Sequence, residues 1–324
     1  MNVALDPAPA TRSARKTFIR ATEVWLPDGQ DTLRLGSGVY GELQAFAEVS
    51  GEETFRYAEG LPGRAWSERR PIVLKGFQGT YFKRTEAAQS AGLTAAAALP
   101  VFDGEALKGV LVFLFGDDAD HIGAVEVWAA SGQTDGALAL EDGYFGAARH
   151  FEWIARHTRF PVGQGLPGSV LKAGGAMLFR DLGAGYRFVR AESAADAGLT
   201  NGLGIPGPAF AGKSYVVTLL SALGAPIARR FEIWARRPEG DFVLRDEIDA
   251  DGAAAAAGAP PCFAPGEGAL GTVAASGAPL ATSGLDASGA GPGELRGAAA
   301  GYGTLIACPI YRGGALAEIA AWYL

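Results

Sequence analysis

The chain has 324 residues, of which 48% are hydrophobic, 10% aromatic and 19% charged, so it can build sizeable cores and is not globally disordered. Its 28 basic and 35 acidic residues give a net charge of −7, which argues against a nucleic-acid partner. The 47 glycines follow no three-residue period, which excludes collagen.

Two features bear on location. The first 16 residues lack the apolar stretch of a secretion signal, and the longest dense apolar run, residues 109–115, is much shorter than the roughly 20 residues that cross a membrane. The two cysteines, Cys262 and Cys308, permit at most one disulfide and form no Cys-x-x-Cys pair. We therefore expect a cytoplasmic protein without a membrane-spanning segment.

The first hundred residues predict an α+β unit. In chain order, the predicted elements are two strands at residues 21–25 and 33–35, two helices at 62–69 and 83–91, and two strands at 95–102 and 109–115. Pro62 suits a first helical turn, and Gly92 suits the end of the second helix. Strands at both ends with helices between them predict an antiparallel sheet with helices packed on it.

The same landmarks occur three times along the chain. Glu23-Val24-Trp25 recurs as Glu126-Val127-Trp128 and as Glu232-Ile233-Trp234, and Gly-Leu-Pro-Gly at 60–63 recurs at 165–168 and, altered, at 268–271. A proline also ends an apolar run in each copy, at Pro100, Pro206 and Pro309. Repeats of this length match whole small domains rather than solenoid modules.

We therefore predict three tandem domains, at residues 18–117, 122–222 and 228–324. The third is expected to be degenerate, because its middle, residues 251–303, is dominated by Gly and Ala. It lacks the Phe, Arg and Glu that precede and open the Ala-rich helix in the first two repeats.

The repeats resemble a known family. The residues that carry the resemblance are the Glu-Val-Trp strand, Gly-Leu-Pro-Gly-Arg-Ala-Trp at 60–66, the Ala-rich helix ending in Ala-Gly-Leu at 91–93, and the closing strands. In these residues the chain resembles a tandem GAF-domain protein, of the Leu-Pro-Gly variety found in bacterial sensors and plant NIN-like regulators. The resemblance implies a ligand-sensing or dimerising module, with a six-stranded antiparallel sheet and a pocket between one face and the helices. It does not name a ligand or a cofactor.

Aromatic and charged residues around the Ala-rich helix are the candidate ligand contacts. They are Phe77, Tyr81, Phe82, Arg84 and Glu86 in the first repeat, and Tyr186, Phe188, Arg190 and Glu192 in the second. An arginine near aromatic rings can hold a carboxylate or phosphate while a ring packs on the ligand. Because Arg84 and Glu86 are two residues apart, they point differently from a helix, and the alternative is that they face solvent.

Other patterns favour structural interpretations. Residues 163–168 and 266–271 fit G-x-G-x-x-G but lack a parallel βαβ context, so they predict helix starts, which could still hold an anion. His150 and His157 would share a helix face, where a haem or metal role competes with that of ordinary surface histidines. Cys262 and Cys308 lie in the degenerate repeat and are expected to be core or structural thiols. No metal site and no catalytic residue is predicted.

These observations favour a non-catalytic small-molecule sensor or an adaptor of signal transduction, with the ligand in the pocket of the first or second repeat, or in both. The alternative is a structural or assembly protein whose domains mediate dimerisation or partner binding without a ligand. A signalling protein and a second copy of the chain are the expected partners. An enzyme ranks below both, because no nucleophile–base pair recurs in the repeats.

Overall fold

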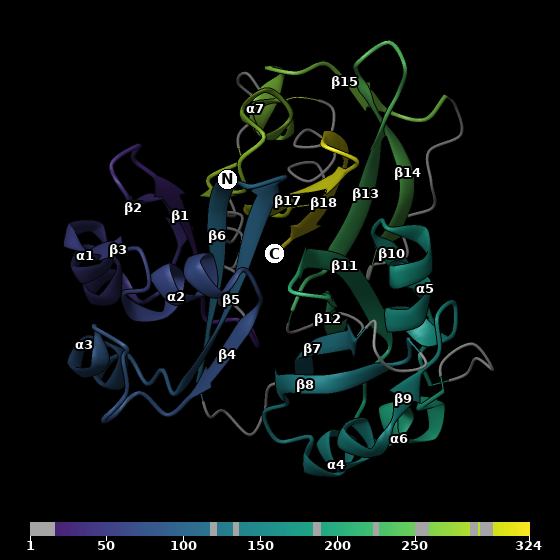
Figure 1. Cartoon of the computed structure of the whole chain (residues 1–324), viewed down its shortest axis with the longest axis horizontal. Helices are drawn as coiled ribbons and strands as arrows, with labels where there is room; N and C mark the ends of the chain where they lie inside the picture. The colour runs from purple at the N-terminus through teal and green to yellow at the C-terminus, as the bar shows by residue number, and fades with distance from the viewer. Residues whose placement is uncertain are drawn as a thin grey trace, which may run out of the picture.

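Three six-stranded sheets follow one another along the chain (Figure 1). The computed structural model describes residues 17–116, 122–131, 136–183, 189–222, 227–249, 259–285, 291 and 301–324. All strand neighbours within the three sheets are antiparallel, and helices pack on each sheet. The predicted α+β fold class is confirmed.

The first sheet has the strand order β3-β2-β1-β6-β5-β4, so the first and last strands of the repeat pair at its centre. Its elements are β1 (Ala21–Pro27), β2 (Thr32–Val39), α1 (Gln44–Glu52), β3 (Thr54–Arg56), α2 (Gly60–Glu68), β4 (Ile72–Lys75), α3 (Thr85–Ser90), β5 (Ala95–Asp103) and β6 (Ala106–Phe115). The sequence pattern missed α1, β3 and β4, which are short and carry weak periodicity.

The second and third sheets repeat this order as β9-β8-β7-β12-β11-β10 and β15-β14-β13-β18-β17-β16. The second comprises β7 (Gly123–Ser131), β8 (Leu138–Tyr144), α4 (Arg149–His157), β9 (Arg159–Phe160), α5 (Gly165–Ala173), β10 (Met177–Phe179), α6 (Ala191–Asp196), β11 (Asn201–Phe210) and β12 (Lys213–Ser221). The third comprises β13 (Arg230–Arg236), β14 (Phe242–Asp249), β15 (Cys262–Phe263), α7 (Gly268–Ser276), β16 (Leu280–Ser283), β17 (Thr304–Arg312) and β18 (Ala315–Tyr323).

The Gly-Leu-Pro-Gly motif is a structural helix start. A Cβ on the last glycine of the motif would lie 2.1 Å from a backbone carbonyl oxygen at Gly63, 2.2 Å at Gly168 and 2.7 Å at Gly271. Only glycine lets the helix approach the preceding segment so closely. In the second repeat, the strand before the motif is antiparallel to its neighbour, unlike the parallel unit that dinucleotide binding requires.

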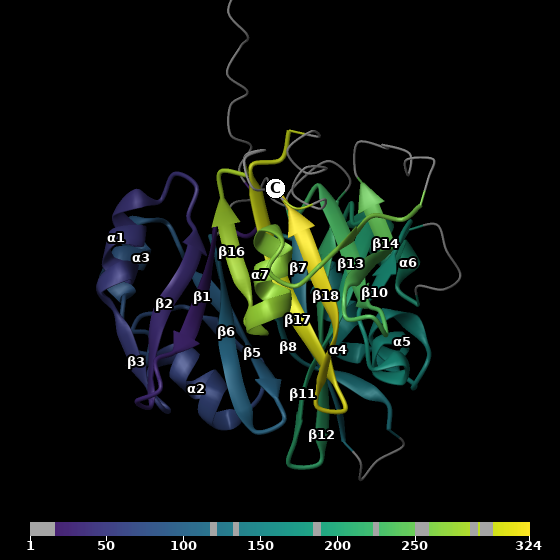
Figure 2. The ribbon, with the colours of Figure 1, turned by 90° about the horizontal axis from the view of Figure 1, so that it is seen from above.

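Each sheet buries both of its faces. The outer face packs against the repeat's own helices, which lie on the outside of the molecule in both views (Figures 1 and 2). The inner faces of all three sheets meet in one shared core, to which Val24, Val127 and Ile233 contribute from equivalent positions, together with Phe113 and Trp322. The three repeats are therefore parts of one packed body.

The repeats are joined cyclically. Strand β4 contacts β8, β10 contacts β14, and β16 contacts β2, so the fourth strand of each repeat meets the second strand of the next and the third repeat closes on the first. Lys75 and Asp142 pair at 3.0 Å across the first junction, and Arg180 and Asp246 at 2.7 Å across the second. At the third junction an amide of β16 donates to Ser37 Oγ at 3.1 Å.

Within the described ranges, no helix combines the length and apolar character that a bilayer crossing requires.

Candidate functional site

The recurring Glu-Val-Trp motif builds a buried polar centre in every repeat. Its glutamate and tryptophan are two residues apart on a strand and therefore share a face, whereas the residue between them faces the shared core. The indole Nε1–H donates to the glutamate at 3.0 Å in the first repeat and at 2.9 Å in the other two. Glu23, Glu126 and Glu232 are all fully buried, so each requires a compensating cation or hydrogen-bond donors.

In the first repeat, the compensating cation is Arg84, at the N-cap of α3. Its guanidinium forms a two-pronged ion pair with Glu23, with 2.8 Å between Nη2 and Oε2. The same guanidinium lies over Phe46 and Phe82, at 4.8 and 5.4 Å from the ring centres. The Tyr40 hydroxyl also donates to Glu23, at 3.2 Å, and burial together with the Glu23 carboxylate raises the pKa of Tyr40.

The second repeat has the same arrangement. Arg190, at the N-cap of α6, contacts the two oxygens of Glu126 at 2.5 and 2.9 Å, and the Thr218 hydroxyl donates to this carboxylate at 2.7 Å. The guanidinium lies 4.4 Å from the ring centre of Phe151 and 5.5 Å from that of Phe160. In these two repeats, an arginine and its aromatic neighbours occupy the space between sheet and helices.

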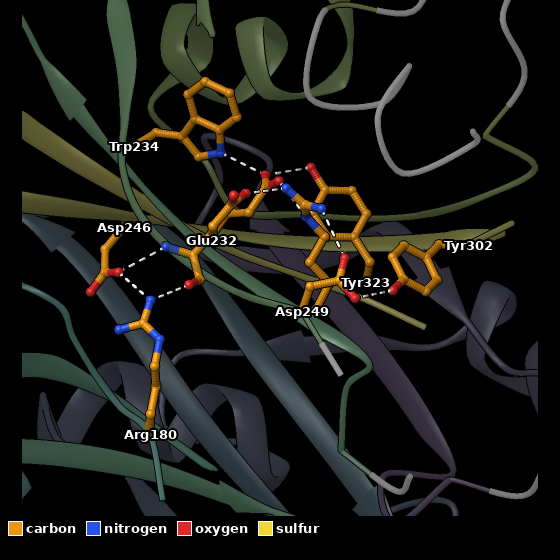
Figure 3. Close-up of polar contacts among 9 residues, drawn as sticks. Arg180, Glu232, Trp234, Asp246, Asp249, Tyr302 and Tyr323 are labelled. Atoms are coloured by element: carbon orange, nitrogen blue, oxygen red, sulfur yellow. Dashed lines mark hydrogen bonds and ion pairs between the residues drawn. The ribbon is translucent and has the colours of Figure 1, made fainter. Parts of the chain in front are cut away.

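The third repeat keeps the glutamate but takes its cation from the same strand. Arg230 pairs with Glu232 at 2.6 Å. Tyr323 donates to the same carboxylate at 2.8 Å (Figure 3). Asp249 also contacts Arg230, at 3.0 Å. Burial raises the pKa of Glu232, and Arg230 opposes that rise. The same view shows Arg180 reaching Asp246 from the second repeat.

The predicted ligand contacts fall into buried and exposed groups. Arg84 and Arg190 are 4% and 3% exposed, so the alternative that Arg84 faces solvent is wrong. The acidic residues two positions on, Glu86 and Glu192, are exposed. Helix geometry thus separates arginine and glutamate as expected, and the buried member is the arginine.

One aromatic candidate of the first repeat, Phe82, contacts Arg84. Phe77 and Phe82 are buried and stack at 3.9 Å, while Tyr81 is half-buried with the Arg64 guanidinium 4.2 Å from its ring centre. Tyr186 and Phe188 of the second repeat lie outside the described residues. Ligand contact by any of the nine candidates stays a prediction.

A cavity of about 290 Å³ opens in the second repeat between the start of α4 and the end of α6. Arg149 and His150 of α4 and Ser193 and Asp196 of α6 give it polar lining, and Phe151 contributes an apolar wall. Phe151 is the ring on which Arg190 rests. The cavity therefore adjoins the buried ion pair without including it.

The histidines and cysteines occupy ordinary positions. His150 and His157 are exposed on α4, and both of their rings lie against Trp153. Cys308 is buried, as expected of a core thiol, whereas Cys262 is exposed and so is no core residue. Both thiols are free.

Comparison with protein families identifies the repeat unit. Residues 14–127, which include all of the first sheet, match the model of the GAF domain, and the other two sheets have the same strand order. The chain is a tandem of GAF-like domains. GAF domains occur in sensor and signalling proteins and in general do not catalyse reactions. None of the curated proteins matches the chain.

Several solved structures resemble parts of the tandem GAF chain. They include the A. aeolicus nlh2 GAF domain in an inactive state (20% identity, TM-score 0.26), free methionine-R-sulfoxide reductase from Neisseria meningitidis (19%, 0.23) and NreA of Staphylococcus aureus mutated in its nitrate binding site (18%, 0.26). The matches cover 31%, 30% and 34% of this chain and 59%, 51% and 80% of those chains, respectively. The first two matches thus span less than two thirds of the length of those structures.

The residues that pair with Arg84 and Arg190 in the buried polar centres were not identified from the sequence. Glu23, Tyr40 and Thr218 bind the arginine or its glutamate, yet none of them was a candidate. The threefold recurrence of Glu-x-Trp was visible, and a glutamate that recurs on an apolar strand could have been recognised as a buried partner for an arginine.

Proposed function

We propose that the protein is a non-catalytic sensor of signal transduction that binds a small molecule in its second GAF-like domain. The observation that carries the proposal is the cavity of about 290 Å³ between α4 and α6. A concave site with an apolar wall and a few convergent polar groups is typical of small-molecule binding. The occurrence of GAF domains in sensor proteins supports the same function.

The lining favours a small polar ligand. Arg149 can pair with a negative group, Asp196 can accept hydrogen bonds, and His150 can do either. Phe151 and the alanines at the start of α4 offer apolar contact to the body of the ligand.

A signal can leave the cavity through Arg190. This residue is the N-cap of α6, and its guanidinium joins Phe151 in the cavity wall to Glu126 on the central strand β7. A ligand that shifts α6 would displace this ion pair and strain the strand that faces the shared core on its other side. The first domain has the equivalent ion pair, between Arg84 and Glu23, and can serve as an internal control in experiments on Arg190.

Ligand screening on the full chain tests the proposal. A panel of amino acids, organic acids, nucleotides and inorganic anions is screened by thermal shift, and hits are measured by calorimetry. Ala197→Trp should fill the cavity, which Ala197 lines, and abolish binding, whereas Ala91→Trp at the equivalent place in the first domain should leave it unchanged. If only Ala91→Trp abolishes binding, the ligand binds in the first domain instead. If no compound binds, the sensor proposal is wrong.

The second candidate function is assembly without a ligand. It is favoured by the filling of the space between sheet and helices with Arg84 and Arg190 and their aromatic neighbours. A ligand-free protein that forms a stable oligomer in light scattering, with an unchanged oligomer in Ala197→Trp, would support this function over sensing.

A further inference from the structure

The recurring prolines lie just beyond the point where each outer strand stops pairing with its neighbour. Pro100, Pro206 and Pro309 each lie two residues beyond the last residue that pairs with the outer strand of the repeat. Those last pairs are Ile72 with Ala98, Met177 with Gly204 and Leu280 with Ala307. Proline suits such a position, because it has no N–H that would be left without a strand partner. Beyond these last pairs, the edge of β5, β11 or β17 that faced the outer strand has no pairing with that strand, and we call it the free edge.

The three free edges surround one cavity, here called the axial cavity. Its volume is about 410 Å³, and it is lined by the three prolines, Arg69, Tyr215 and Arg312 among other residues of all three domains. The strands that carry the prolines contact one another, β5 with β11 and β5 with β17. The axial cavity exists only because the three domains close into a ring, and it is separate from the cavity between α4 and α6.

The charge around the axial cavity is positive. Among the described residues that line it are two arginines and no Asp or Glu. Arg312 pairs with Glu318 at 3.2 Å, but Glu318 also pairs with Arg245, so one carboxylate serves two guanidinium groups. Arg69 pairs with Glu105 at 2.7 Å, and the Glu105 side chain is 92% exposed, which weakens this pair by solvent screening.

Arg69 has an unmet hydrogen-bond donor. Its Nε–H is buried and finds no partner among the described residues, although its guanidinium lies 4.3 Å from the ring centre of Phe102 and 5.2 Å from that of Phe210 in the next domain. Leaving a buried donor without a partner is unfavourable. The stacked rings hold the arginine at the cavity wall.

The backbone of Arg69 also departs from the repeat pattern. It ends α2 with a φ of 49°, where the equivalent residues are Gly174 and Gly277 with φ values of 60° and 68°. Glycine adopts this conformation freely and arginine does so at a cost. The first domain therefore has an arginine in a strained backbone conformation where the other two domains have glycine. Such strain is consistent with a functional role for the Arg69 side chain.

We propose that the axial cavity binds a small organic anion. The acidic group of the ligand pairs with the Arg69 guanidinium, which lines the cavity, and the apolar part lies against Pro100, Pro206 and Pro309. Arg312, which also lines the cavity, adds positive charge. Binding would hold the three domains together at the one place where all of them contribute to the same surface.

The test uses two matched fluorescent probes on the full chain. 1-Anilinonaphthalene-8-sulfonate is an organic anion with an apolar body, and N-phenyl-1-naphthylamine is the same body without the sulfonate. Arg69→Gly removes the side chain and keeps the backbone conformation, so the variant should fold. Arg237→Gln, which changes an exposed arginine paired with Asp241, is the control.

The sulfonate probe should bind saturably with one site per chain. Arg69→Gly and Arg312→Gln should each weaken its affinity about tenfold, in keeping with the loss of a hydrogen bond to a charged group. Binding of the neutral probe should change less than twofold in either variant, and Arg237→Gln should change neither probe. Failure of the sulfonate probe to saturate, equal affinity in Arg69→Gly and the unsubstituted protein, or equal losses for both probes would each overturn the proposal.

Discussion

Replacing Arg190 with Met should destabilise the second GAF-like domain strongly. The substitution keeps much of the side-chain volume beside Phe151 but removes two hydrogen bonds, of 2.5 and 2.9 Å, to Glu126. Glu126 is fully buried and, among the described residues, would keep the Trp128 and Thr218 donors. Removing one partner of a buried ion pair costs about 3–5 kcal/mol, because the other charge stays buried.

The size of this effect can be separated from general damage by two further variants. Arg190→Met combined with Glu126→Gln removes both charges and should recover at least about 1 kcal/mol relative to the single variant. Arg156→Met, which removes the exposed pair of Arg156 with Glu152 in the same domain, should cost no more than about 0.5 kcal/mol.

Hydrogen exchange in increasing urea, read on peptides from β7 and β12, measures the stability of this domain within the full chain. Whole-chain unfolding curves are less suitable, because a chain of this size need not unfold in one step. A cost for Arg190→Met that matches Arg156→Met, or a double variant less stable than the single one, would refute the assignment of this arginine as the charge partner of a buried glutamate.

Four other predictions concern single residues. Gly168→Ala should lower the free energy of unfolding of its domain by about 2 kcal/mol, because a Cβ there meets a backbone carbonyl. Ala58→Gly should raise that of the first domain by about 0.5–1 kcal/mol, because Ala58 has a φ of 64°. Both are measured by hydrogen exchange in increasing urea on peptides of the substituted domain. Burial raises the pKa of Cys308 to about 12, so this thiol should not react in the native protein. Native protein should therefore react with one equivalent of a thiol reagent, at the exposed Cys262, and denatured protein with two. Burial raises the pKa of Tyr311 from 10.0 to about 12, so its neutral form stabilises the fold below pH 10 and this contribution is lost as the pH rises to 12; Tyr311→Phe should flatten the fall in unfolding midpoint over that range.

The repeated elements of the fold could be predicted because each is specified locally. Glycines with close backbone contacts, and the proline in the first turn of α2, act within a few residues, so Gly-Leu-Pro-Gly predicts a helix start wherever it occurs. The closing hairpin of β5 and β6 is likewise specified by two apolar runs and the turn between them.

The buried ion pairs and the shared core could not be predicted in the same way. Arg84 and Glu23 are 61 residues apart, and nothing local tells whether a charged residue on a strand faces water or an arginine. Apolar residues on both faces of β5 and β6 indicate burial on two sides but do not say which partner covers the second side. The second and third sheets supply that partner, since β11 and β17 both contact β5.

The shared core explains why a third domain with a weakened sequence pattern remains part of the chain. Its inner face contributes Ile306, Ile310 and Trp322 to the same cluster as the inner residues of the other two sheets. Without it, two sheets would present these apolar surfaces to water, a condition that promotes aggregation. Selection can therefore relax, in the third domain, the positions equivalent to the Phe, Arg and Glu of the Ala-rich helix, while both buried faces of its sheet stay under constraint.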